Sequence, residues 1–248
     1  RMYNDENQDL PVESTRLHPR GKWARRVTGV VASTVMLLAA TVAGAAPTLP
    51  QVDEETHLGV ASCSGSTCHG AGRPFDDAVV LQNEYVTWHR EDDHSNAYDV
   101  LRTDEGQRIA SRLGVGKAHE AKVGLDCHSD NVPPERRGPK FQLSDGVGCE
   151  ACHGGAGDWV DSHNNEGTSH ADNVARGMYP TDDPAARTRM CMGCHYSHPE
   201  SPMTHRIMGA GHPPMLFEVD TFTNIQPRHY EVDQDYREFL AAELEAWK

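Results

Sequence analysis

The sequence predicts a mostly α-helical protein with little or no sheet and with long loops over residues 129–145 and 154–188, which are rich in Gly, Pro, Asp and Asn. Apolar side chains alone would not fill the centre of such a protein. No segment alternates apolar and polar residues as a strand would, whereas residues 103–114 and 233–244 have helical apolar spacing. Aromatic residues make up 6% of the 248 residues and mean hydropathy is −0.64, so the side chains would form a thin core. The chain also has fifteen histidines and seven cysteines. Together with the low apolar content, they indicate that a bound cofactor fills the centre.

The acidic charge balance excludes one large class of partner. The chain has 23 basic and 37 acidic residues, a formal net charge of −14. Nucleic acid selects basic surfaces, so we expect no nucleic-acid partner.

The first 46 residues are predicted to direct the chain out of the cytoplasm. Residues 27–46 carry no charge, four basic residues lie just before them, and Ala43-Gly44-Ala45 has the small-residue pattern of a cleavage site. Two alternatives stay open: a cleaved export signal, or an N-terminal membrane anchor, because twenty apolar residues can just span a bilayer. In both cases residues 47–248 form the exported domain, with 17 basic and 33 acidic residues and a net charge of −16.

The cysteines fall into four groups, and in each group the last cysteine is followed at once by a histidine. Two groups have the C-x-x-C-H pattern of covalent c-type haem attachment. Two thiols one helical turn apart reach the two haem vinyl groups, and the adjacent histidine directs its ring nitrogen at the iron. These two groups are Cys149, Cys152 and His153, and Cys191, Cys194 and His195.

The other two groups are variants of the same motif. Cys63 and Cys68, followed by His69, are separated by four residues, a loop that can bulge out. Cys127-His128 lacks the first cysteine, because Gly124 stands in its place, and a single thioether could hold that haem. Four haems, one of them attached only through Cys127, would use all seven cysteines.

Zinc binding and disulfide formation are the two other uses that cysteine pairs commonly have. Paired C-x-x-C segments can bind zinc, but zinc does not explain why histidine follows the last cysteine each time. Disulfides suit an exported protein, but seven is an odd number and C-x-x-C loops are too short for structural cross-links. For Cys127-His128 alone, a chance dipeptide in a three-haem protein stays an alternative.

Ten further histidines in residues 47–248 are available as second axial ligands. Low-spin electron-transfer haems need such a ligand, and a second imidazole keeps the potential low. The ten are His57, His89, His94, His119, His163, His170, His198, His205, His212 and His229.

Three segments resemble a known family. Gly146-Val-Gly-Cys-Glu-Ala-Cys-His-Gly-Gly155, followed by Trp159 and His163, is similar to the third haem-binding segment of the tetrahaem cytochrome c-554 family. Trp88 with the segment 94–101 resembles that family's W…HAxAxxxL segment, although the Trp–His interval is one residue longer. The segments 205–214, 217–222 and 228–230 are similar to the C-terminal part of related multihaem cytochromes.

The resemblance implies a set of distal ligands and a function. It favours His94 and His163 as ligands, then His212, then His205, with His229 in reserve. In that family the second haem can lack a distal ligand, so whether one haem is five-coordinate stays open. The resemblance implies a multihaem c-type cytochrome wrapped around a cluster of covalently bound haems.

Three functions follow as hypotheses. The first is an exported electron carrier between redox partner proteins in the periplasm or at the cell surface, more probable for this sequence than an enzyme. The second is an anchored or polymerising subunit of a larger redox complex. The third is a haem enzyme that acts on a small nitrogen or oxygen ligand at an open haem. The acidic charge predicts partners that dock through basic patches.

Overall fold

The computed structural model describes residues 46–75 and 80–229, and the regular structure in these ranges is helical. No strand occurs among these residues, where the ladder contacts are isolated bridges between His57 and Arg137 and between His198 and Ser201. The predicted fold class is therefore confirmed. The helices are α2 (Glu84–Glu91), α3 (Ala97–Val100), α4 (Asp104–Leu113), α5 (Lys122–His128), α6 (Glu150–His153), α7 (His170–Val174), α8 (Pro184–His195), α9 (His205–Gly209) and α10 (Val219–Ile225).

Two predictions lie outside the described residues. These are the export signal or anchor in residues 1–46, of which only residue 46 is described, and the helix expected over residues 233–244. Within the described ranges, no helix has the length and apolar character needed to cross a bilayer.

Helix α4 forms where its local signals predict it. The Thr103 hydroxyl accepts a hydrogen bond from the Gly106 amide at 3.1 Å, which caps the N-terminus. At the other end Gly114 has a φ of 70°, the left-handed conformation that closes a helix. The apolar face buries Ala110 and Leu113.

The loop predicted over residues 154–188 is partly wrong. It contains α7, which begins with a capping box between Ser169 and Asp172, and the start of α8. The Asp183 side chain accepts from the first amides of α8, and Pro184 occupies the first helical position. Both caps are local sequence signals. The loop over residues 129–145 contains two short 3-10 helices, Pro134–Arg136 and Leu143–Asp145.

The apolar core of the described residues consists of two small clusters, in line with the thin core predicted from composition. One contains Leu49, Tyr179, Ala186 and Met190. The other contains Leu101, Ala110, Ala118 and Leu125. Each cluster packs against a cysteine-bearing helix: Cys191 of α8 lies against the first, and Leu125 of α5 is part of the second.

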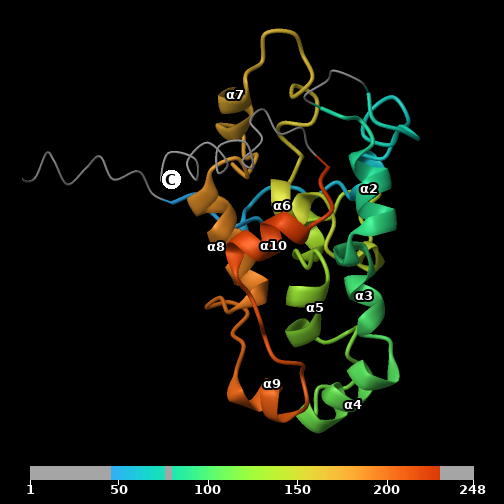
Figure 1. The fold of residues 1–248 in the computed structure, drawn as a ribbon, viewed down its shortest axis with the longest axis vertical. Helices are drawn as coiled ribbons and strands as arrows, with labels where there is room; N and C mark the ends of the chain where they lie inside the picture. The colour runs from blue at the N-terminus through green and yellow to red at the C-terminus, as the bar shows by residue number, and fades with distance from the viewer. Residues whose placement is uncertain (1–45, 76–79, 230–248) are drawn as a thin grey trace, which may run out of the picture. The chain divides into compact units, whose positions relative to one another are not determined.

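Helices α5 and α6 lie in the middle of the described domain, and α8 lies on the side away from α2 and α3 (Figure 1). Helices α2, α3 and α4 follow one another along one side, and α4 contacts α9 at one end. Helix α5 contacts both α3 and α8. This arrangement places three of the four Cys-His groups on helices that face one another.

Candidate haem-binding centre

Three of the four motif histidines are the last residues of their helices. Helix α5 ends at His128, α6 at His153 and α8 at His195. In α6 the His153 amide donates to the Cys149 carbonyl at 2.9 Å, so one helical turn brings the two cysteines of the motif and the histidine together. The arrangement agrees with the reason given for the C-x-x-C-H spacing.

In the widened first motif the histidine amide also bonds to the carbonyl of the first cysteine, although the residues between them do not form a full helical turn. The His69 amide donates to the Cys63 carbonyl at 3.1 Å, as His153 does to Cys149. The extra residues form a tight turn in which the Cys68 amide donates to the Gly65 carbonyl at 2.8 Å. The bulge therefore absorbs the insertion, as predicted.

The second motif lacks its first cysteine at a position where a side chain does not fit. A Cβ atom on Gly124 would lie 2.8 Å from the Ala118 carbonyl oxygen and 3.1 Å from a Leu101 methyl group. Both neighbours belong to the packed region between α3 and α5. The glycine is therefore required by the close approach of these segments.

Each motif histidine faces one other histidine ring, and each pairing is different. The ring centroids are 6.1 Å apart for His69 and His163 and 5.9 Å apart for His94 and His195. They are 6.3 Å apart for His128 and His212 and 6.4 Å apart for His153 and His229. The angles between the ring planes are 23°, 90°, 62° and 80° in the same order.

These separations are those of two imidazoles that share one metal ion. With each Nε2 about 2 Å from a metal ion that lies between the two rings, the ring centroids would be roughly 6.2 Å apart. Aromatic pairs without a metal span about 4.5–7 Å, so one such distance would decide nothing. Four values between 5.9 and 6.4 Å, one for each motif histidine, fit four metal positions.

Hydrogen bonds at Nδ1 set the chemistry of five of these rings. An Nδ1–H that donates to a carboxylate or carbonyl leaves Nε2 unprotonated, the form that binds a metal. The five bonds run from His69 to Glu84 at 3.0 Å, His94 to Asp92 at 2.8 Å, His128 to the Ala97 carbonyl at 3.1 Å, His163 to the Val160 carbonyl at 2.5 Å, and His212 to the Pro213 carbonyl at 2.8 Å.

The electrostatics of the motif histidines follow from burial and from these partners. Burial lowers the pKa of His128 and His195 and lowers that of His153 to about 4, so these rings are neutral near pH 7. The hydrogen bond to Glu84 instead raises the pKa of His69. A neutral imidazole is the form that a metal takes.

Two of the histidines ranked from the sequence as distal ligands differ in what their rings face. His205 is exposed at the start of α9 and has no ring contact with another described residue. His229, ranked below it, lies opposite His153. Its Nδ1 is 3.4 Å from the Pro227 carbonyl oxygen. No local sequence signal distinguishes the two residues, because the pairing depends on where the segment after α10 returns to the domain.

The cysteines of different motifs also meet. The Cys63 and Cys149 thiols lie close enough to shift each other's pKa, as do those of Cys127 and Cys194. Cys152 and Cys191 pack against the same apolar cluster around Leu49. The motifs are therefore neighbours in the order first, third, fourth, second.

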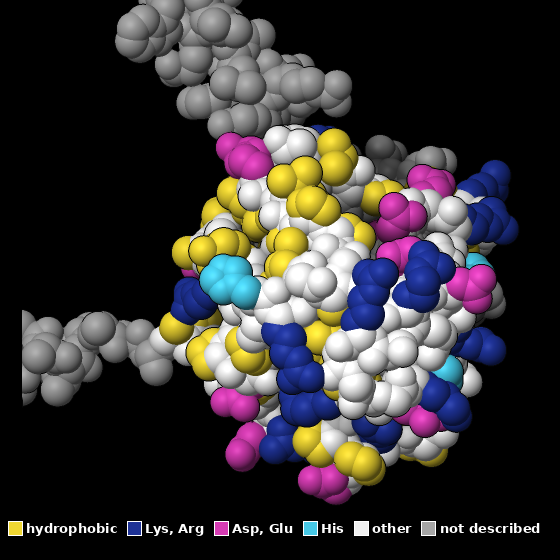
Figure 2. Space-filling model, turned by 90° about the horizontal axis from the view of Figure 1, so that it is seen from below, with side chains coloured by type: hydrophobic (Ala, Val, Ile, Leu, Met, Phe, Trp, Pro, Cys, Tyr) yellow, Lys and Arg dark blue, Asp and Glu magenta, His cyan; other side chains and the backbone are white. Residues whose placement is uncertain are grey.

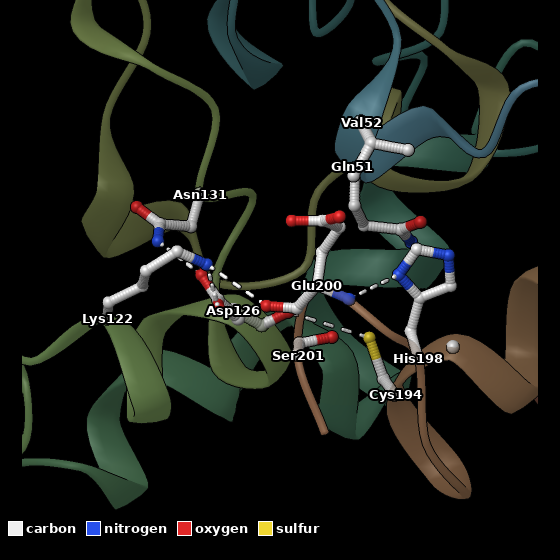
Figure 3. Close-up of a pocket in the computed structure, with 10 residues that line it drawn as sticks. Gln51, Val52, Lys122, Asp126, Asn131, Cys194, His198, Glu200 and Ser201 are labelled. Atoms are coloured by element: carbon white, nitrogen blue, oxygen red, sulfur yellow. Dashed lines mark hydrogen bonds and ion pairs between the residues drawn. The ribbon is translucent and has the colours of Figure 1, made fainter. Parts of the chain in front are cut away.

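A polar network joins the second and fourth motifs around a cavity of about 50 Å³ (Figure 3). Asp126 accepts hydrogen bonds from Lys122 at 2.5 Å and from Asn131 at 2.7 Å, and its carbonyl lies 3.7 Å from the Cys194 sulfur. Lys122 also donates to the Glu200 carbonyl at 3.4 Å, and the Glu200 amide donates to His198 at 3.3 Å. The cavity is far too small for a porphyrin, and its walls hold α5 against α8.

A buried polar cluster that the sequence did not reveal holds the third motif. His57 is fully buried, with Nδ1 2.7 Å from Asp130 and Nε2 3.3 Å from Asp53. Beside it, the Glu150 carboxylate accepts hydrogen bonds from three backbone amides, those of Leu58, Gly59 and Ala156, at 2.7, 2.7 and 2.8 Å. Since both ring nitrogens of His57 are occupied by carboxylates, we assign this histidine a structural role.

The helix-terminal Cys-His motifs and the all-helical fold define a c-type cytochrome, an electron carrier with covalently bound haem c. Residues 62–154 match the family described as cytochrome c554 and c-prime, which confirms the resemblance over this part of the chain. The matched range contains the first three motifs and ends before the fourth motif and before His163. No curated protein and no solved structure matches the chain.

Proposed function

We propose that this chain is an exported tetrahaem c-type cytochrome that passes electrons between redox partners in the periplasm or at the cell surface. The observation that carries the proposal is the one-to-one pairing of the four motif histidines with four other histidines at 5.9–6.4 Å. Covalently bound haem supplies the one-electron chemistry, and the chain supplies ligation, spacing and tuning.

The contacts between cysteines support a continuous path. A thioether joins each cysteine sulfur to the porphyrin rim, so cysteines in contact imply rims that lie close together. The first and third motifs meet through Cys63 and Cys149, and the second and fourth through Cys127 and Cys194. Cys152 and Cys191 connect the two pairs. The first and second motifs are then the ends of the path, where partners exchange electrons.

The tight packing at Gly124 supports attachment of the second haem by Cys127 alone. A cysteine at position 124 would bring its Cβ to within 2.8 Å of the Ala118 carbonyl oxygen. His128, which faces His212, supplies the ligand on the same helix. One thioether and two axial histidines would hold this haem.

The pairing also separates the carrier from the enzyme alternative. A haem that activates a small ligand needs an open coordination position, and therefore a motif histidine with no facing ligand. Each of the four motif histidines has a facing histidine, including His128 of the second motif, whose haem can be open in the family. No observation favours the enzyme.

The first experiment measures intact mass and the pyridine haemochrome spectrum of the exported protein. Four haems, with one single-thioether spectrum and loss of about 45 N-terminal residues, are expected. Three haems would leave Cys127-His128 as an ordinary dipeptide. A full-length mass would support the membrane-anchored alternative for residues 27–46.

The second experiment uses the two histidines that compete for one role. We expect His229→Ala to convert one haem to a high-spin, carbon monoxide-binding form, because it removes the ring opposite His153. We expect His205→Ala, the matched control, to leave all haems low-spin. A high-spin haem in His205→Ala, or none in His229→Ala, would contradict the ligand assignment.

A further inference from the structure

One end of the described domain differs in charge from the rest of it. Residues 102–122 and 203–212 contain six basic and three acidic residues, a net charge of +3, whereas the rest of the described residues contain 9 basic and 22 acidic residues, a net charge of −13. We call the surface of these two segments the basic face. Its cations are Arg102, Arg108, Arg112, Lys117, Lys122 and Arg206.

The basic face is a single surface in three dimensions. Helices α4 and α9 contact each other at one end of the described domain, and the view onto that end shows Lys and Arg side chains gathered on it (Figure 2). The side chains of Arg102, Lys117 and Lys122 are 62%, 63% and 71% exposed, and they form ion pairs with Asp99, Glu120 and Asp126. Arg108 forms an ion pair with Glu105. The positive charge that no carboxylate of the described residues partners therefore comes from Arg112 and Arg206. The exposed Val115 and Val123 add apolar area between the charges.

Two arginines bring this charge close to the second motif. The Arg112 guanidinium donates to the Ala210 carbonyl at 3.0 Å, and that of Arg206 donates to the Leu113 carbonyl. Neither has a carboxylate partner among the described residues, so their charge is not neutralised. Both bonds join α4 to α9 or its C-cap residue Ala210, two residues before His212, whose ring lies opposite His128.

We propose that the basic face is the docking surface for a redox partner protein with an acidic docking face, which exchanges electrons through the second motif. The inference rests on the proposed function, in which the second motif is one end of the path. Transient electron-transfer pairs are commonly guided by opposite charges arranged around a small contact. The net charge of the chain predicts a partner with a basic docking face. Such a partner would suit the acidic remainder of the surface, whereas the basic face suits a partner with an acidic docking face.

Two other occupants fit the surface less well. A second copy of the chain would bring together two molecules that each carry a net charge of −14, which repel each other before contact. An anionic membrane favours clusters of four to eight basic residues. The basic face instead interleaves its cations with Asp104, Glu105 and Glu120.

The test uses the holo-protein and a strongly acidic [2Fe–2S] ferredoxin as the probe. Carbodiimide joins lysines to carboxylates of a bound partner, and residues 47–229 contain three lysines. Cross-links at Lys117 and Lys122 are expected, and none at Lys140, which lies outside the basic face. Cross-links mainly at Lys140 would overturn the proposal.

Affinity of charge-reversed variants completes the test. Arg108→Glu with Lys117→Glu is expected to weaken ferredoxin binding about tenfold or more at low salt, since two attractive contacts become repulsive. The control, Arg90→Glu with Arg176→Glu, makes the same change in net charge outside the basic face and is expected to change affinity less than about twofold. Equal losses in both variants would overturn the proposal.

The outcomes also separate this inference from the proposed function. Haem content and low-spin spectra are measured on the same samples. Intact haems without preference for the basic face would refute only the docking surface, whereas missing haems would refute the carrier itself. Salt-sensitive dimerisation of the wild type, abolished by the first double variant alone, would assign the face to a second copy and overturn the proposal.

Discussion

The buried Asp53–His57–Asp130 cluster makes the stability of the protein depend on pH in a way that can be calculated. Burial acts to lower the pKa of His57, but the hydrogen bonds that its ring donates to Asp130 and Asp53 outweigh burial and raise this pKa from 6.5 to about 10. The imidazolium is therefore bound more tightly in the folded than in the unfolded protein. Its contribution to the free energy of unfolding is fully present below pH 6.5 and is lost as the pH rises to about 10.

The size of the effect follows from the interval between the two pKa values. At about 1.4 kcal/mol per pH unit, the interval corresponds to about 4–5 kcal/mol. In His57→Gln, which leaves two buried carboxylates without a cation, we expect about 3–5 kcal/mol less stability near pH 6.5. The variant should also lose the decline between pH 6.5 and 10.

Guanidinium unfolding of the holo-protein at pH 6.5, 8 and 10, followed by tryptophan fluorescence, measures both quantities. The matched control is His170→Gln, because His170 also pairs with an aspartate, Asp182 at 3.0 Å, but is 51% exposed. An exposed pair contributes little, so the control should follow the wild-type curve. A His57→Gln variant that keeps the wild-type pH dependence would refute the reasoning.

Three further changes test the haem-binding centre. Glu84→Gln removes the carboxylate 3.0 Å from His69 Nδ1. A tenfold weaker ligation of the oxidised haem, about the size expected for loss of such a partner, raises one midpoint potential by about 59 mV in a spectroelectrochemical titration. Unchanged potentials would exclude a role of Glu84 in tuning the His69 ligand. Gly124→Ala should lower the free energy of unfolding by about 1–3 kcal/mol, because the new Cβ meets a carbonyl oxygen. The control Gly72→Ala, with open space around the residue, should unfold at the same guanidinium concentration as the wild type. Equal unfolding midpoints for the two variants would contradict the packing argument. Glu150→Gln leaves one of three backbone amides poorly paired and should lower the free energy of unfolding by about 1–3 kcal/mol, measured the same way, and a neutral result would show that the amides find other partners.

The parts of the fold that the sequence predicted are those with local causes. Helix α4 follows from the Thr103 cap, its apolar stripe and Gly114, all within one segment. The Cys-His motifs likewise depend on neighbouring residues. The caps of α7 and α8 were also local, at Ser169 and Asp183, but they lie among glycines and polar residues that favoured a loop prediction.

What the sequence could not predict depends on contacts between distant segments. The pairing of His153 with His229 rather than His205 is fixed by the return of the chain after α10. His57 and Asp130 are 73 residues apart, so nothing near His57 distinguishes a buried cation from the nine other histidines considered as ligands. A histidine becomes a ligand or a structural cation according to what its two nitrogens meet.

The basic face differs in sign from the net charge of the whole chain. Residues 102–122 alone carry five basic and three acidic residues in an otherwise acidic chain, so five of the six cations of the basic face were visible as a charge pattern. The sixth required the fold, because Arg206 joins this surface only through the contact of α9 with α4. Net charge governs repulsion at long range, whereas docking depends on charges within about 10 Å of the contact. A chain of net charge −14 can therefore present a surface that attracts an acidic partner.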